Sequence, residues 1–346
     1  MKNYQKIIIS LILSVLSLCA CAKDKDIDDS ERIDFHTELQ TSYLNDNYKN
    51  ISPYADGTKE LSKPKGYEIS FANPDHIMYA VHLRSEIDNR DFACDTETFA
   101  FNNLYLDTKY HYELRKDGQI YTQGDFTTTK KGPRNLDVEG VTNFRDLGGY
   151  PTLNGGYTKQ GMIYRSAKFN ANESDVSLIT DKGRDVVLGE LKMKAEIDLR
   201  LDYNNENGNI TESVIDSSVK YYPVPMEYNG NLLYINATEV VHLFEIISKR
   251  ENYPFVFHCS IGTDRTGFVG MILNALLEVE PEFIYRDYMF SNFGLIGSGR
   301  DGSAIDSYFN AFSTYEATTL KDQVIAYLVS IGVPKSQINS FLRIMK

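Results

Sequence analysis

Apolar and polar residues alternate in several short runs between residues 33 and 130. The alternation passes through Tyr67–Phe71, Tyr79–Leu83 and Tyr110–Leu114, and a period of two predicts strands that bury one face. The segment Lys116–Gln119 then offers a tight turn into a further strand over residues 120–128. We therefore expect residues 33–130 to form a small β-sandwich.

The pattern changes after residue 133, where short apolar strands alternate with amphipathic helices. The expected strands are Gly161–Ser166, Ala195–Arg200, Val219–Val224 and Phe255–Phe257, and the expected helices include Asp181–Lys192 and Thr238–Arg250. This alternation predicts an α/β domain over residues 133–346, with a central sheet flanked by helices. The polar stretch Lys130–Asn135 contains a Gly-Pro pair and is predicted to link the two domains.

The first twenty residues have the pattern of a secretion signal. Lys2 and Lys6 precede an apolar run, Ile7–Leu18, which is too short to span a membrane comfortably. The following Leu18–Cys21 resembles a bacterial lipoprotein box, and the small residue before Cys21 favours lipidation there. An ordinary cleaved signal or a short signal anchor are the alternatives.

We expect residues 1–20 to be removed as a signal peptide and Cys21 to carry the lipid. Residues 21–32 are charged and have no core pattern, so they are predicted to be a solvated tether. The protein would then be lipid-anchored in a bacterial cell envelope, outside the cytoplasm, either in the periplasm or on the cell surface.

Composition and charge argue against a nucleic-acid partner, a metal site and a disulfide framework. The chain has 346 residues, with 48 acidic against 36 basic side chains and a formal net charge of −12. This balance argues against a nucleic-acid partner, which would require a basic face. The six histidines show no ligand spacing, so no metal and no other cofactor is predicted. Besides Cys21, only Cys94 and Cys259 remain after signal removal, too few for a disulfide framework.

The candidate chemistry lies at a predicted turn from a strand to a helix. Phe255–Phe257 is followed by Cys259, five further residues and Arg265, and then by an apolar helical stretch. A helix N-terminus offers unpaired N–H groups and a positive dipole end, which attract an anion and favour the thiolate form of a nearby cysteine. Arginine adds a planar fork that can hold two phosphate oxygens. The alternative without catalysis is a cysteine that is buried at the end of a strand and precedes a helix by chance.

Two motifs resemble those of one enzyme family. Residues 258–267 fit the pattern HCxxGxDRTG, and residues 143–149 read NFRDLGG. Both are similar to a bacterial branch of the cysteine-dependent protein-tyrosine phosphatases. In addition, Leu104–Tyr110 resembles the approach to the tyrosine corner of fibronectin type III domains, with Tyr110 as the corner residue.

The phosphatase resemblance implies a role for each residue of the loop. Cys259 would be the nucleophile that forms a phosphocysteine, and Thr266 would hydrogen-bond its sulfur. The phosphate-binding residues would be Ser260, Ile261, Gly262, Thr263, Asp264 and Arg265. His258 would order the loop, and Arg145 and Asp146 would brace it.

The general acid is less defined by the sequence. In the NFRDLGG branch the aspartate before the loop arginine has been regarded as functional, so Asp264 is the first candidate. Asp198 and Glu227 are the alternatives. If neither is the acid, Asp198 would form a structural ion pair and Glu227 would be an exposed loop carboxylate.

Three functions remain open from the sequence. The first is a phosphomonoester hydrolase, most plausibly a protein-tyrosine phosphatase. The second is a phosphoinositide or inositol-phosphate phosphatase, although the branch commonly has lysine where this chain has Thr263, which weakens a preference for polyphosphates. The third is a surface binding protein that uses an inactive phosphatase domain, against which the intact Cys259 and Arg265 argue.

Overall fold

The computed structural model describes residues 28–170, 178–203 and 205–346. Residues 1–32 form a unit apart from residues 33–346, and within them the structure describes a single turn of 3-10 helix, η1 (Asp29–Glu31). The predicted signal peptide, the lipidated Cys21 and most of the predicted tether lie outside the described residues. None of the helices in the described parts of the chain is long and apolar enough to cross a membrane.

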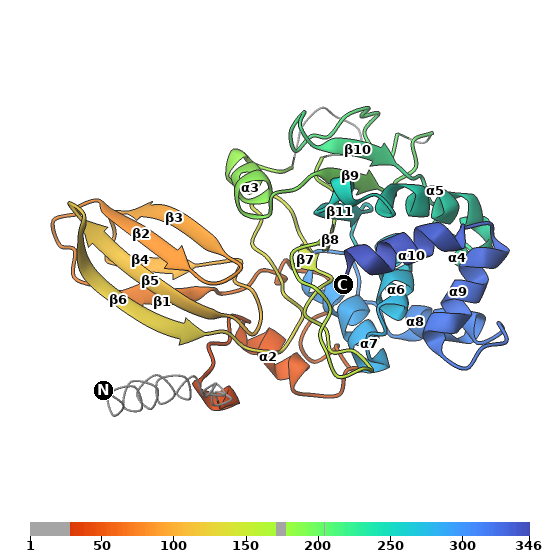
Figure 1. The fold of residues 1–346 in the computed structure, drawn as a ribbon, viewed down its shortest axis with the longest axis horizontal. Coiled ribbons are helices and arrows are strands. Elements are labelled where there is room, and N and C mark those ends of the chain that lie inside the picture. The colour runs from red at the N-terminus through yellow and green to blue at the C-terminus, as the bar shows by residue number, and fades with distance from the viewer. Residues whose placement is uncertain (1–27, 171–177, 204) are drawn as a thin grey trace, which may run out of the picture. The chain divides into compact units, whose positions relative to one another are not determined.

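Six antiparallel strands follow in two sheets (Figure 1). One sheet pairs β1 (Tyr67–Ser70) with β4 (Thr98–Phe101), and the other has the order β3-β2-β5-β6, with β2 (Tyr79–Arg84), β3 (Asn89–Cys94), β5 (Lys109–Lys116) and β6 (Gln119–Thr127). The predictions of β1, β2, β5 and β6 are confirmed. The pattern missed β3, in which three polar residues precede three apolar ones without alternation, and β4, which has only four residues.

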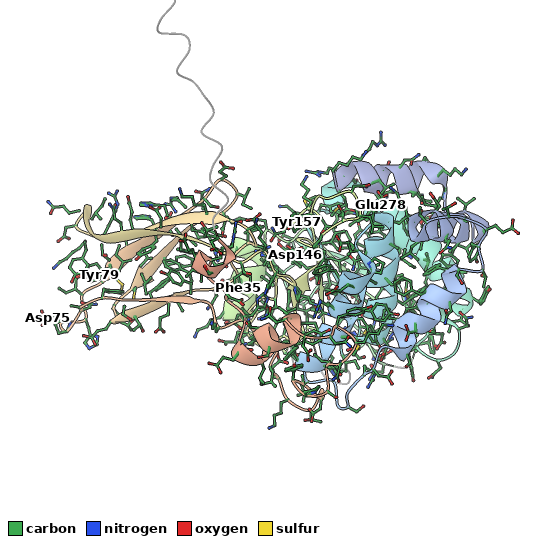
Figure 2. The ribbon with its side chains drawn as sticks, turned by 90° about the horizontal axis from the view of Figure 1, so that it is seen from below. Phe35, Asp75, Tyr79, Asp146, Tyr157 and Glu278 are labelled. Atoms are coloured by element: carbon green, nitrogen blue, oxygen red, sulfur yellow. The ribbon has the colours of Figure 1, made fainter. Side chains whose placement is uncertain are left out.

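The two sheets share one apolar cluster. Its members come from both sheets and include Ile69, Tyr79, Phe101 and Phe126; Figure 2 labels Phe35 and Tyr79, two members far apart in the cluster. The buried Tyr110 hydroxyl accepts the N–H of Tyr105 at 3.0 Å, five residues upstream, as a tyrosine corner would require.

The second part of the chain is built on a five-stranded sheet with the order β10-β9-β11-β8-β7. The strands are β7 (Arg145–Asp146), β8 (Ile163–Ser166), β9 (Ala195–Asp198), β10 (Lys220–Pro223) and β11 (Phe255–His258). All pairs are parallel except β7 with β8. Each strand predicted in this region is present, and the mixed α/β class is confirmed.

Helices cover the sheet on one face, and a short helix with loops covers the other (Figure 1). Side chains alternate between two cores: Phe257 belongs to the cluster with the C-terminal helices, and Val256 belongs to the opposite cluster. After η1, the helices in the described residues are α2 (Glu38–Leu44), α3 (Asp181–Asp185) continuing into η2 (Val186–Glu190), α4 (Leu232–Ile235), α5 (Ala237–Ile247), η3 (Arg250–Asn252), α6 (Asp264–Leu276), α7 (Pro281–Met289), η4 (Phe290–Phe293), α8 (Ser303–Phe312), α9 (Leu320–Ser330) and α10 (Lys335–Ile344).

The predicted linker is not a solvated connection. Arg134 and Asn135 are each 1% exposed, and the Arg134 guanidinium donates to the carbonyls of Leu104 and Asn103 and to the Asp146 carboxylate, all at 2.8–3.0 Å. The Arg134 charge can be buried because these partners satisfy it. Residues 33–346 form one unit, so the predicted domains at 33–130 and 133–346 stay a prediction.

Candidate active site

The candidate loop lies where β11 ends at the carboxyl edge of the parallel sheet. Residues 259–263 connect His258, the last residue of β11, to Asp264, the first of α6. Cys259 is 2% exposed and Arg265 is 5% exposed, so the thiol and the guanidinium are both sheltered. Ligands in open α/β sheets bind at this edge, which agrees with the predicted position of the site.

The curl of the loop depends on Gly262. Its φ is +71°, and a Cβ at this position would lie 2.5 Å from the carbonyl oxygen of Ser166, so no other residue fits without displacement of the backbone. The side chain of Asn143 donates to the carbonyls of Ile261 and Gly262 at 3.1 and 3.3 Å, and Arg165 donates to the latter at 2.8 Å.

These donors hold the loop carbonyls on the outer side of the curl. Among the residues that the structure describes, the N–H groups of residues 260–263 donate to no protein acceptor. Consecutive N–H groups left in this way form a nest for an anion at the start of α6.

A buried carboxylate, Asp287 of α7, supports the donors. It pairs with Arg165 and with Arg145 (3.0 Å), and it accepts the Tyr150 hydroxyl at 3.0 Å. Burial raises the pKa of Asp287, but Arg165 and Arg145 outweigh burial and hold the pKa below its usual range. Arg145 therefore braces the site from within the protein, as predicted. Asp146 also has a structural role, since it pairs with Arg134 at 2.8 Å.

Arg265 is held by a carboxylate that the sequence patterns did not indicate. Glu206 accepts from Arg265 at 2.9 Å with one oxygen and pairs with it again through the other, which also accepts the Ser260 hydroxyl. The carbonyls of Leu199 and Met226 accept from the same guanidinium at 3.2 and 3.3 Å. Burial raises the pKa of Glu206, but the hydrogen bonds from Arg265 and Ser260 lower it to about 2.

Sequence reasoning missed Glu206 because it lies in an irregular segment without apolar periodicity. Its only signal was position: it follows β9, the neighbour of β11, so it emerges at the same edge of the sheet. Lys168 was missed for the same reason. It follows β8, its N–H donates to the Ser260 carbonyl at 3.4 Å, and burial, together with the charge of Arg200, lowers its pKa.

The structure separates the three candidate acids. Asp264 opens α6 with a 36% exposed side chain and accepts from Tyr288 at 3.2 Å and from Arg300 at 3.3 Å. Glu227 is half-buried and accepts the hydroxyl of Tyr203; this bond, with burial, raises the pKa of Tyr203 to about 12.

Asp198 is the candidate that the structure disfavours. Its carboxylate is 1% exposed and is held by the Arg200 guanidinium at 2.6–3.1 Å. Burial raises the pKa of Asp198, but His258 and Arg200 outweigh burial and lower it. A buried carboxylate kept ionised in this way is a structural ion pair rather than a proton donor.

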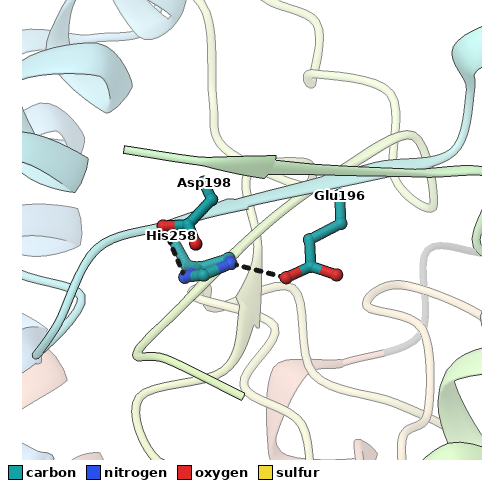
Figure 3. Close-up of side chains that lie close together, drawn as sticks. All are labelled: Glu196, Asp198 and His258. Carbon is teal, nitrogen blue, oxygen red and sulfur yellow. Dashed lines mark hydrogen bonds and ion pairs between the residues drawn. The ribbon is translucent and has the colours of Figure 1, made fainter. Parts of the chain in front are cut away.

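His258 lies in a buried polar cluster behind the loop (Figure 3). Its Nε2 is 2.9 Å from a Glu196 oxygen, and its Nδ1 is 3.8 Å from Asp198 and 3.5 Å from the Cys259 carbonyl. These contacts agree with a loop-ordering role for His258.

One possible ligand atom from each of Glu196, Asp198 and His258 lies within 4.8 Å of the others. These three side chains are nevertheless a poor fit for a metal, because their oxygens already accept from protein donors: Glu196 accepts the Ser213 hydroxyl at 2.5 Å, and Asp198 accepts Arg200. That the protein needs no metal stays a prediction.

One expected contact is not present. Within the described residues the hydroxyl of Thr266 is buried and has no hydrogen-bond partner, including the Cys259 sulfur. The predicted bond from Thr266 to the thiolate is therefore not formed in this structure.

Comparison with known proteins places this site in a family. The family model described as "Tyrosine phosphatase family" matches residues 136–322, more than half of the chain. The chain belongs to the tyrosine phosphatase family. The match contains β7 to β11, the loop at Cys259 and Glu206. This phosphatase is therefore a cysteine-dependent phosphoric monoester hydrolase, as predicted.

Individual relatives of this phosphatase are distant. A protein of Cupriavidus necator, whose name assigns it provisionally to the tyrosine-protein phosphatases, is 23% identical over 187 residues, covering 50% of this chain and 68% of its own. Among solved structures, P. aeruginosa TpbA is 17% identical (TM-score 0.31, 51% of this chain and 89% of its own). The core catalytic domain of the PP-IP phosphatase SIW14 from S. cerevisiae is 21% identical (TM-score 0.30, 47% and 94%).

The pairing of Glu206 with Arg265 predicts a component of acid sensitivity. Because the pKa of Glu206 falls from an ordinary 4.5 to about 2 on folding, its ionised form contributes about 3 kcal/mol above pH 4.5, which is lost as the pH falls toward 2. Glu206→Gln removes this contribution. The difference in the free energy of unfolding between wild type and variant, measured in urea, should shrink by about 2 kcal/mol from pH 6 to pH 3.

Glu212→Gln is the matched control, since Glu212 is an exposed carboxylate in the same segment. Its difference from wild type should be small at every pH. A Glu206→Gln difference that stays constant with pH would contradict the assigned ion pair.

Proposed function

We propose that this enzyme is a protein-tyrosine phosphatase that works through a phosphocysteine on Cys259. The observation that carries the proposal is the sheltered thiol beside Arg265 in a loop whose N–H groups have no protein acceptor among the described residues. A phosphoryl group bound in this loop would meet the nest and the guanidinium with its oxygens and the thiolate with its phosphorus.

The reaction has two steps. The Cys259 sulfur attacks phosphorus, the bond from phosphorus to the ester oxygen breaks, and the leaving oxygen takes a proton from a carboxylic acid, for which Asp264 is our first choice. Water then attacks phosphorus and gives a proton to the carboxylate left by the first step, and the bond between sulfur and phosphorus breaks, which releases inorganic phosphate and regenerates the thiolate and the acid. Arg265 and the loop N–H groups stabilise the charge on the phosphoryl oxygens in both steps.

A phosphoinositide or inositol-phosphate substrate is the second candidate, and one observation favours it. Lys168, whose backbone N–H donates to the Ser260 carbonyl, adds a cation within electrostatic range of Glu206, and a further cation near the loop favours a second phosphate. Against this, position 263 carries a threonine rather than lysine, and its hydroxyl donates to the Ile261 carbonyl at 3.4 Å. Arg300, a further cation near the loop, is engaged by Asp264. A single extra cation fits a monophosphorylated substrate better.

The proposed setting is the bacterial envelope, with a lipid on Cys21 and the enzyme outside the cytoplasm. The sequence of residues 1–21 supports this placement. We further propose that residues 33–130 are a fibronectin III-like domain. The hydrogen bond from the Tyr105 N–H to Tyr110 and the two antiparallel sheets around one core support that assignment.

The roles of the nucleophile and of the loop arginine can be tested by substitution of Cys259 and Arg265. Cys259→Ser should reduce hydrolysis of a phosphotyrosine peptide to background, since a hydroxyl at this position is far less nucleophilic than a thiolate. Arg265→Lys, which loses the planar fork, should lower kcat/KM about 10²–10³-fold. Phosphate release under reducing conditions measures both variants.

Cys94→Ser is the matched control, since Cys94 is a buried free cysteine on β3, and it should stay active. A panel of phosphotyrosine peptides, phosphoinositides and sugar phosphates then separates the candidate substrates. Retained activity in Cys259→Ser would contradict the phosphocysteine mechanism. If folded wild type hydrolyses no substrate of the panel, the binding-protein alternative is favoured.

The acid can be identified by the dependence on the leaving group. Asp264→Asn should lower kcat about 10²–10⁴-fold for phenyl phosphate, whose leaving oxygen needs a proton. The loss should be much smaller for p-nitrophenyl phosphate, because its leaving group is stable as an anion. Steady-state kinetics on both substrates provides the measurement.

Glu227→Gln serves as the comparison, because Glu227 is the other partly exposed candidate. The assignment to Asp264 fails if Glu227→Gln shows the leaving-group dependence and Asp264→Asn lowers both rates equally.

The anchor can be tested by fractionation. Cys21→Ser should move the enzyme from the membrane fraction to the soluble fraction and abolish labelling by a radioactive fatty acid, because lipidation requires that thiol. Cys19→Ser should leave both unchanged. If Cys21→Ser stays labelled and membrane-bound, the lipoprotein assignment is wrong.

A further inference from the structure

An exposed tyrosine ring lies directly beside the phosphate-binding arginine. The centroid of the Tyr228 ring is 5.2 Å from Cζ of Arg265, within the range of a cation–π contact. Tyr228 is 52% exposed, whereas Arg265 is 5% exposed. The ring thus stands at the boundary between the buried phosphate-binding group and solvent.

The segment before Tyr228 is fixed to the sheet. The N–H groups of Val224 and Met226 donate to the carbonyls of Asp198 and Leu199 at 2.8 and 3.1 Å, and the Met226 carbonyl accepts from Arg265 at 3.3 Å. The place of the ring therefore depends on the same strands and the same guanidinium that form the site.

The residue next to Tyr228 is fixed as well. The Asn236 side chain accepts the Glu227 N–H at 2.8 Å and donates to the Glu227 carbonyl at 3.1 Å. A ring held by such a backbone loses little conformational freedom when a ligand packs on it.

A second exposed ring joins the first through Glu227. The hydroxyl of Tyr203, which is 62% exposed, donates to the Glu227 carboxylate. Tyr203 follows β9 and Tyr228 follows β10, and both strands end at the carboxyl edge of the sheet. Exposed aromatic side chains at a binding edge supply flat apolar surface for a ligand.

We propose that Tyr228 is a specificity-determining residue whose ring packs against the aromatic ring of an aryl phosphate ester, with Tyr203 supporting the adjacent wall. The inference rests on the proposed function and names the part of the substrate that this enzyme reads beyond the phosphate. A phosphoryl group held by Arg265 places its ester substituent toward solvent, and Tyr228 lines that exit. A flat aryl group stacks there, whereas a serine phosphate offers no ring.

The experiment compares a ligand that has the aryl ring with one that lacks it. The KM for a phosphotyrosine peptide and the inhibition constant of inorganic phosphate are measured in wild type, Tyr228→Ala and Tyr228→Phe. Tyr228→Ala should raise the KM about 3–10-fold with kcat nearly unchanged, as expected for the loss of one aromatic contact. Its inhibition constant for phosphate should not change, and Tyr228→Phe should behave as wild type.

Tyr157→Ala is the matched control, because Tyr157 is 54% exposed and lines a separate cavity of about 430 Å³ with Glu278 and with Leu276, the last residue of α6. Figure 2 labels Tyr157 and Glu278. Neither constant should change in this variant.

Two results would overturn the inference. If phosphate inhibition weakens as much as the KM rises, Tyr228 acts by positioning Arg265 and not by contact with the aryl ring. If neither constant changes, the ring does not contact the substrate. Wild type that fails to hydrolyse the phosphotyrosine peptide but cleaves other phosphoesters would instead refute the proposed function, and this inference with it.

Discussion

The buried carboxylate of Asp287 is the constraint on which the phosphate-binding loop depends. It pairs with two arginines, Arg145 and Arg165, that are themselves almost fully buried. Arg165 then donates to the Gly262 carbonyl, and the loop is held with its carbonyls outward. Removing one partner of a buried ion pair costs about 3–5 kcal/mol, so the phosphate nest is stabilised by a charge that never touches the phosphate.

This arrangement explains why much of the site was predictable and part of it was not. The loop itself is contiguous in sequence, so its thiol, its guanidinium and its glycine could be read from residues 259–265, and the flanking strand and helix follow from apolar patterning. The motif NFRDLGG at residues 143–149 allowed the bracing role of Arg145 to be predicted. Asp287, in contrast, lies within a helix whose letters suggest a solvated acidic position, and only the tertiary fold brings it to the two arginines.

Glu206 and the predicted linker also have partners that only the tertiary fold brings together. A loop glutamate carries no periodic signal, and its partnership with Arg265 arises because parallel strands end at a common edge. Arg134 of the predicted linker likewise has partners that no local pattern indicates, because Asn103, Leu104 and Asp146 come from other segments of the chain. β3 was missed because its polar and apolar residues form two blocks, and β4 because three of its four residues are apolar, so neither strand shows a clear period of two.

The ion pair between Arg265 and Glu206 also affects how the thiol of Cys259 avoids oxidation in the oxidising compartment that we propose. Oxidation requires both a thiolate and access to it, and Cys259 is 2% exposed, in a loop whose Ser260 is joined to Arg265 of α6 by Glu206. A phosphoester competes for the guanidinium that Glu206 holds, so substrate binding must rearrange or share this ion pair. The contact from Glu206 thus orders both Ser260 and Arg265, and Glu206 is ionised, as this contact requires, at neutral pH.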